Sequence, residues 1–123
     1  MKPRKILVVE SSKTMQKAYA LMLRMHPLTY AQDAREALER LRQDDEIDLV
    51  LVDVQYVLEL FFHLELTQDL ERQPRTVIVL SYEGRDEDTV TALEKGAAAY
   101  IKKPFHAEEL IDLIDRVEAP RRE

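Results

Sequence analysis

Three short runs of consecutive apolar residues constrain the fold of this chain more than any other feature. They occupy residues 6–9, 49–52 and 77–80, and each is followed at once by a polar residue. A strand covered on one face alternates apolar and polar side chains, whereas a strand covered on both faces is apolar throughout. The runs therefore predict central strands of a sheet that lies between two layers.

Helical patterns separate these runs and give an alternating order along the chain. The predicted helices are the segment between Ser12 and Pro27 and residues 34–42, 57–66, 89–95 and 107–118. Weaker strands are expected at 28–31 and 98–101, and Met15, Met22 and Met25 are expected in the core. Five strand–helix units predict an α/β fold on an open, doubly wound, five-stranded parallel sheet.

The third predicted helix, residues 57–66, carries a period-two pattern as well as a helical one. A crossover between parallel strands normally uses a helix, so we assign it as helix, closed by Pro74. The stripe assigned to the sheet consists of Leu58, Phe61, Phe62, Leu66 and Leu70. Leu60 and Leu64 are then surplus, and lie either in a deeper core or on an apolar patch for a partner or second copy. We expect at least one of Leu60, Phe62 and Leu64 to be substantially exposed.

Charge and composition narrow the class of protein. The formal net charge is −6, with acids and bases interspersed, so we expect no nucleic-acid binding by this domain. The absence of cysteine excludes disulfides and thiolate metal sites. No stretch approaches the roughly 20 apolar residues of a membrane span. The 123 residues suit a soluble, cytoplasmic domain over 1–119, with 120–123 as a tail or the start of a linker.

Polar side chains at the strand ends are the candidate functional residues. Glu10, Asp53, Ser81 and Lys103 each follow a predicted strand, and in such sheets function gathers beyond the carboxyl ends of the strands. A carboxylate there can be a nucleophile that forms an acyl phosphate. A hydroxyl, an ammonium and a divalent cation on oxygen ligands would assist it, because each neutralises or grips phosphoryl oxygens.

The segments around these strand ends match one known family. The matching residues are 6–11, 48–53, 79–81 and 96–105. On these motifs the chain resembles the receiver domains of bacterial response regulators, which have a (βα)5 flavodoxin-like fold. The most specific match is Lys103-Pro104. In that family a Lys-Pro pair, usually joined by a cis bond, aims the lysine into the site, whereas Lys102 would point to the other face.

The resemblance implies a role for each residue of the site. Asp53 would be the phosphoacceptor, Ser81 the hydroxyl that senses the phosphoryl group, and Tyr100 the aromatic switch residue that follows Ser81. Mg²⁺ would be held by Glu10, by Asp53 and by the backbone carbonyl of Gln55. The three histidines are scattered along the chain, so we expect no histidine metal site.

Two departures from the family pattern bear on this chemistry. The family has two adjacent acids after the first strand, but here Glu10 is followed by Ser11. Either Ser11 or Ser12 can cap the following helix, and we expect Ser11 to be an N-cap rather than a metal ligand. Mg²⁺ binding is then expected to be weak or absent. The family also has Met-Pro and then glycine after the phosphoacceptor, whereas Tyr56-Val57 stands here and no glycine occurs before Gly84. A remodelled loop and helix start are therefore predicted.

Two functions compete, and an enzyme with a diffusible substrate is disfavoured. The first is a two-component receiver that takes a phosphoryl group on Asp53 from a histidine kinase or phosphotransfer protein. It would then switch a surface for an effector protein or domain, with a homodimer as a further option. The alternative is a pseudo-receiver that binds a protein partner without phosphorylation. No glycine-rich phosphate loop or histidine-based triad supports a separate enzymatic activity.

Overall fold

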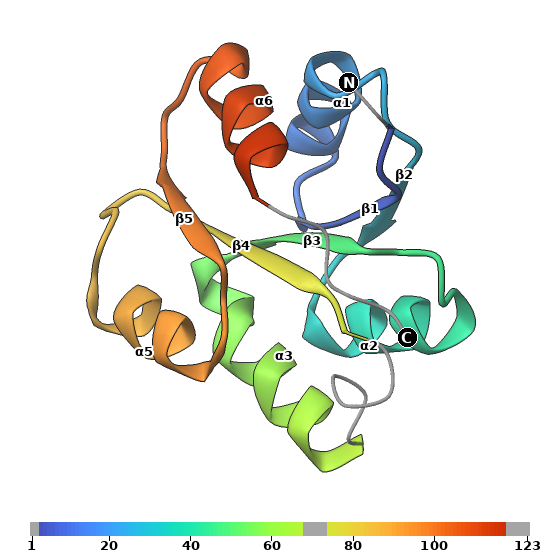
Figure 1. The fold of residues 1–123 in the computed structure, drawn as a ribbon, viewed down its shortest axis with the longest axis vertical. Helices are drawn as coiled ribbons and strands as arrows, with labels where there is room; N and C mark the ends of the chain where they lie inside the picture. Colours follow the sequence, from blue (N-terminus) through green and yellow to red (C-terminus); the bar gives the residue numbers. More distant parts are fainter. Residues whose placement is uncertain (1–2, 68–73, 118–123) are drawn as a thin grey trace.

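The computed structural model describes residues 3–67 and 74–117, and these form one parallel sheet between two helical layers (Figure 1). The elements in chain order are β1 (Ile6–Val9), α1 (Lys13–Met22), β2 (Leu28–Ala31), α2 (Ala34–Gln43), β3 (Leu49–Asp53), α3 (Val54–Thr67), β4 (Thr76–Ser81), α5 (Glu87–Lys95), β5 (Ala99–Lys102) and α6 (Ala107–Arg116). The strands are parallel in the order β2-β1-β3-β4-β5. The doubly wound sheet predicted from the apolar runs is therefore confirmed.

The two faces of the sheet carry separate hydrophobic clusters. One cluster contains Leu7, Val50 and Val79 and is covered by α2, α3 and α5. The other contains Val8 and Leu51 and is covered by α1 and α6. Because successive side chains of a strand point to opposite faces, a strand that contributes side chains to both clusters must be apolar at every position. This explains the uninterrupted runs in the sequence.

Helix α3 buries a different stripe from the one predicted. Its core face consists of Val57, Leu60, Phe61 and Leu64, whereas Phe62 is 56% exposed and Leu66 is 67% exposed. The assignment of Phe62 and Leu66 to the sheet is therefore wrong, and Leu60 and Leu64 belong to the deeper core. The expectation that one of Leu60, Phe62 and Leu64 is exposed is confirmed by Phe62. Leu70 lies outside the described residues.

The faces of α3 follow from where the helix begins. It starts at Val54, directly after β3 and three residues before the predicted start. The direction in which the chain leaves β3 thus sets which residues turn toward the sheet. Since α3 also packs between α2 and α5, its buried arc is wider than one stripe, and it includes Leu60 and Leu64.

Helix ends also differ from the predicted boundaries. Helix α1 begins after Ser12, whose Oγ accepts the Met15 N–H at 3.2 Å, and ends at Met22. The core assignment of Met25 is wrong, since it lies beyond the helix and is 61% exposed. Helix α5 begins two residues earlier than predicted, because Asp86 accepts the Thr89 N–H at 2.8 Å. Side-chain capping thus sets both starts.

Arg4 fastens the end of α6 to the start of β1. Its guanidinium donates to the carbonyls of Ile114 and Val117, at 3.2 and 2.9 Å, and to Asp48 at 3.1 Å. These bonds satisfy carbonyls that a helix end leaves without intrahelical partners. The predicted domain boundary at 119 and the tail 120–123 lie outside the described residues. Among the helices the structure describes, none has the length and apolar character needed to cross a membrane.

Candidate functional site

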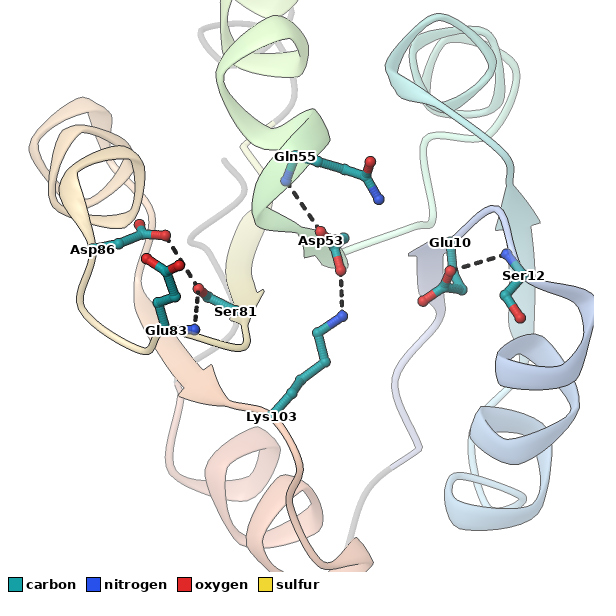
Figure 2. A network of polar contacts seen from close by, with 8 residues as sticks. All are labelled: Glu10, Ser12, Asp53, Gln55, Ser81, Glu83, Asp86 and Lys103. Carbon is teal, nitrogen blue, oxygen red and sulfur yellow. Dashed lines mark hydrogen bonds and ion pairs between the residues drawn. The ribbon is translucent and has the colours of Figure 1, made fainter.

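The register of the sheet places Glu10 beside Asp53 at the carboxyl edge. Val9 pairs with Val52 across β1 and β3, so the next residue of each strand stands at the same level. Both residues are buried: counted over the whole residue, 6% of Glu10 and 8% of Asp53 is exposed. Figure 2 shows the two side chains at neighbouring strand ends. Two acids that are far apart in the sequence therefore share one edge, as the strand-end argument predicts.

Asp53 and Lys103 form a buried ion pair. The Lys103 ammonium reaches across from the segment after β5 and donates to Asp53 Oδ2 (Figure 2). Their side chains are 11% and 8% exposed, and the Lys103-Pro104 bond is cis. Lys102 stays exposed on the other side, where its aliphatic stem lies against Gly84. The pair places a fixed positive charge against the central carboxylate in a poorly hydrated pocket.

Helix α3 replaces the loop that was expected after Asp53. The Gln55 N–H donates to Asp53 Oδ1 at 3.1 Å, so Asp53 also caps the first turn of α3 (Figure 2). In an α-helix the carbonyl points toward the C-terminal end, away from this capping group. The Gln55 carbonyl, which the family resemblance assigns to Mg²⁺, is thus part of the first turn, and its amide faces the carboxylate instead.

Of the two adjacent acids that the family has after the first strand, this chain keeps only Glu10. Its Oε2 accepts the Ser12 N–H at 3.0 Å, so the carboxylate is turned toward the start of α1 (Figure 2). Ser11 is exposed and Ser12 is the N-cap, so of the two candidate caps Ser12 is confirmed and the expectation for Ser11 is wrong. Among the described residues there is no group of three or more acidic, histidine or cysteine side chains that could hold a metal ion.

Ser81 ends β4, one position beyond the register partner of Asp53. Its Oγ accepts the Glu83 N–H at 3.2 Å and donates to Asp86 Oδ2 at 3.4 Å (Figure 2). The hydrogen bond from the Thr89 backbone N–H is the main cause that lowers the pKa of Asp86 below its ordinary value. Asp86 therefore stays an acceptor for Ser81. Ser81 is therefore buried and held by the turn that leads into α5.

Tyr100 lies on the edge strand β5, opposite Val79 of β4, with 36% of its surface exposed. It lines a shallow groove of about 270 Å³ between β5 and α6. The groove is walled by Glu109, Asp112 and Arg116 of α6. The predicted switch residue thus stands at the solvent boundary, next to a charged surface.

Two tyrosines at the pocket were not singled out from the sequence. Tyr19 of α1 is fully buried, and its hydroxyl is without a hydrogen-bond partner in the part of the chain that is described. Burial raises the pKa of Tyr19, and the charges of Glu10 and Asp53 raise it further. The ring of Tyr82 lies over the Lys103 ammonium at 4.6 Å. In the sequence, the one available signal was that Tyr82 directly follows the predicted site residue Ser81.

An open parallel sheet with a buried carboxylate, an ammonium and a hydroxyl at its carboxyl edge defines the class of receiver-like α/β domains. The family model of the response regulator receiver domain matches residues 6–115. The chain therefore belongs to the response regulator receiver domain family.

Curated relatives cover a larger protein than this chain. Alkaline phosphatase synthesis transcriptional regulatory protein SphR of Synechococcus elongatus is 34% identical over 119 residues, covering 87% of this chain and 46% of SphR. Phosphate regulon transcriptional regulatory protein PhoB of Escherichia coli is 32% identical over 120 residues, covering 93% of this chain and 51% of PhoB. The chain thus spans about half the length of the relatives it matches.

Solved structures share the fold. Chemotaxis response regulator CheY4 of Vibrio cholerae superposes with a TM-score of 0.80 at 22% identity, covering 95% of this chain and all of CheY4. NtrX of Brucella abortus superposes with a TM-score of 0.78 at 28% identity, covering 94% of this chain and 26% of NtrX. At the low identity of CheY4, the likeness concerns the fold alone.

Proposed function

We propose that Asp53 is the phosphoacceptor of a two-component receiver domain. The observation that supports this most directly is the buried Asp53–Lys103 pair at the end of β3. A carboxylate held beside an ammonium in a poorly hydrated pocket can attack phosphorus, while the ammonium neutralises the charge that arrives. The donor is a histidine kinase or a phosphotransfer protein that carries phosphohistidine.

The chemistry of transfer follows from the two groups. An Asp53 carboxylate oxygen attacks phosphorus, an O–P bond forms, the N–P bond of phosphohistidine breaks, and its electron pair remains on the imidazole nitrogen. Lys103 moves its contact from the carboxylate to a phosphoryl oxygen, because that oxygen now carries the negative charge. Ser81 lies on the next strand, where its hydroxyl can donate to another phosphoryl oxygen after leaving Asp86.

The oxygen ligands present, the carboxylates of Glu10 and Asp53, fit a weak Mg²⁺ site. Mg²⁺ is commonly bound by one or two carboxylates together with phosphoryl oxygens and water, and Glu10 and Asp53 are the two carboxylates that would hold it. Each is already hydrogen-bonded within the chain, to Ser12 and Gln55 respectively. When bound, the ion would neutralise phosphoryl charge. Ser11 supplies no second acid, so we expect low affinity.

The proposed output is the surface beside Tyr100. Movement of Ser81 toward a phosphoryl group would release Asp86 and the turn before α5, shifting the population between two arrangements of this edge. The groove between β5 and α6 would then present a changed surface to an effector protein, an effector domain or a second copy. Since the SphR and PhoB matches are transcriptional regulatory proteins about twice this length, a separate DNA-binding region is the proposed kind of effector domain.

The second candidate is a pseudo-receiver that binds its partner without phosphorylation. It is supported by the direct start of α3 at Val54, which turns the Gln55 carbonyl into the helix. It is also supported by Ser11 in place of an acid. In this form the Asp53–Lys103 pair is a permanent structural contact, and the surface beside Tyr100 has one arrangement.

Phosphorylation by a small donor separates the two candidates. The protein is incubated with acetyl phosphate or a beryllofluoride reagent, with and without Mg²⁺, and followed by intact mass and amide chemical shifts. Phosphoacceptance predicts a response that increases with Mg²⁺ and disappears in Asp53→Asn. Asp115→Asn removes one exposed carboxylate on α6 that does not line the groove, and it should respond like the parent protein. No response at millimolar Mg²⁺ would instead support the pseudo-receiver.

A further inference from the structure

The Asp53–Lys103 pair is covered by an aromatic ring that is itself largely in solvent. Lys103 and Asp53 keep 8% and 11% side-chain exposure, whereas Tyr82 is 68% exposed. The Lys103 Nζ lies 4.6 Å from the centroid of the Tyr82 ring. An ammonium at this distance is attracted by the ring face, so the ring contacts the Lys103 ammonium while most of the Tyr82 side chain faces water.

The turn after β4 holds Tyr82 in this place. Ser81 anchors one side, because its Oγ accepts the Glu83 N–H. Gly84 follows on the other side with a positive φ of 66°, and a Cβ at this position would lie against the aliphatic stem of Lys102. Tyr82 therefore stands in a hydrogen-bonded turn, between Ser81 and Glu83, that places its ring beside Lys103.

Tyr19 is a second tyrosine near the strand ends, in the hydrophobic cluster on the α1 and α6 side of the sheet. Side chains in an α-helix point toward its N-terminus, and α1 begins at the edge where the strands end. The Tyr19 hydroxyl is buried and without a hydrogen-bond partner among the described residues. Glu10, Asp53 and Tyr82 all raise the pKa of Tyr19 after burial itself. Of the two tyrosines, Tyr19 is thus fully buried, and Tyr82 is the one in contact with both Lys103 and solvent.

We infer that Tyr82 is a gate that determines which phosphoryl donors and how much water reach Asp53. With the ring on Lys103 the carboxylate is shielded, and with the ring turned outward it is open. The shielding of Lys103 is a property of the fold, whereas the effect on donors rests on the proposed phosphoacceptance. A bulky donor protein that displaces the ring gains access that a small molecule lacks.

Chemical modification of Lys103 tests the shielding without any phosphoryl chemistry. The whole chain is treated with an amine-acetylating reagent, and the rates at Lys103 and its exposed neighbour Lys102 are compared by mass spectrometry. Tyr82→Ala should raise the Lys103 rate relative to Lys102 by about two- to fivefold, the population change that an exposed cation–π contact supports. Tyr82→Phe should leave the ratio unchanged, because the ring face makes the contact.

An aromatic side chain far along α3 provides the matched control. Phe62→Ala also removes an exposed ring, and it should not change the Lys103 ratio. Circular dichroism verifies that each variant keeps the parent fold, and Tyr82→Leu, which keeps bulk without a ring, serves if the alanine variant does not. An unchanged Lys103 ratio in folded Tyr82→Ala overturns the gate.

The response to beryllofluoride then separates the gate from the proposed function. A faster response in Tyr82→Ala than in the parent, together with the raised Lys103 ratio, supports both the gate and phosphoacceptance. A raised ratio with no response in either protein supports the shielding and rejects phosphoacceptance at Asp53. A raised ratio with equal response rates rejects control of access by Tyr82.

Discussion

Replacing Lys103 by methionine removes the ammonium from Asp53 and keeps an unbranched, flexible side chain in its place. Removal of one partner from a fully buried ion pair costs about 3–5 kcal/mol. Here the side chains keep 8% and 11% exposure, and Asp53 keeps the Gln55 N–H at 3.1 Å. We therefore expect Lys103→Met to lower the free energy of unfolding by about 2–3 kcal/mol, somewhat less than for a fully buried pair.

A double-mutant cycle with Asp53→Asn isolates the pair. Urea unfolding followed by circular dichroism gives the free energy for the parent, both single variants and the double variant. Because the amide in Asp53→Asn carries no charge, the Lys103→Met change should cost about 1 kcal/mol or less in that background. Lys102→Met, one residue away and exposed, should change stability by less than about 0.5 kcal/mol. Equal costs of Lys103→Met with and without Asp53 would refute the reasoning.

Three further predictions concern the metal, pH and the core. Ser11→Asp should raise Mg²⁺ affinity about tenfold by calorimetry, whereas Ser12→Asp at the N-cap should not. If Ser11→Asp gave no gain in affinity, the missing acid at position 11 would not be the reason for weak Mg²⁺ binding. His26 is buried and accepts the Arg4 N–H, and burial lowers its pKa. The unfolded chain therefore binds the proton first, so the free energy of unfolding should fall as pH drops below about 6.5. That dependence should vanish in His26→Gln and persist in His106→Gln. Leu60→Ala should cost about 3 kcal/mol in urea unfolding and Phe62→Ala less than about 1 kcal/mol; equal losses would contradict the assigned faces of α3.

Local sequence patterns were sufficient wherever one residue interacts mainly with its own strand or turn. The apolar runs at 6–9, 49–52 and 77–80 predicted central strands because burial on both faces leaves no position for a polar side chain. The resemblance of Lys103-Pro104 to the family motif also separated Lys103, which turns to Asp53, from Lys102, which stays in solvent. The shared edge of Glu10, Asp53 and Ser81 followed from the parallel order alone.

The tertiary structure decided what depends on how neighbouring elements meet. Leu60 and Phe62 are both apolar helix residues, and only the packing of α3 between α2 and α5 buries one and exposes the other. The start of α3 at Val54 likewise turned Asp53 into a helix cap as well as an ion-pair partner. Tyr82 became part of the pocket because the turn after β4 lays its ring on Lys103. The sequence alone therefore determined the strands and the residues at their ends, because the apolar runs and the polar residues that follow them lie within short stretches of chain. Burial around a helix and contacts between loops depend on residues far apart in the chain, so they emerged only in the folded molecule.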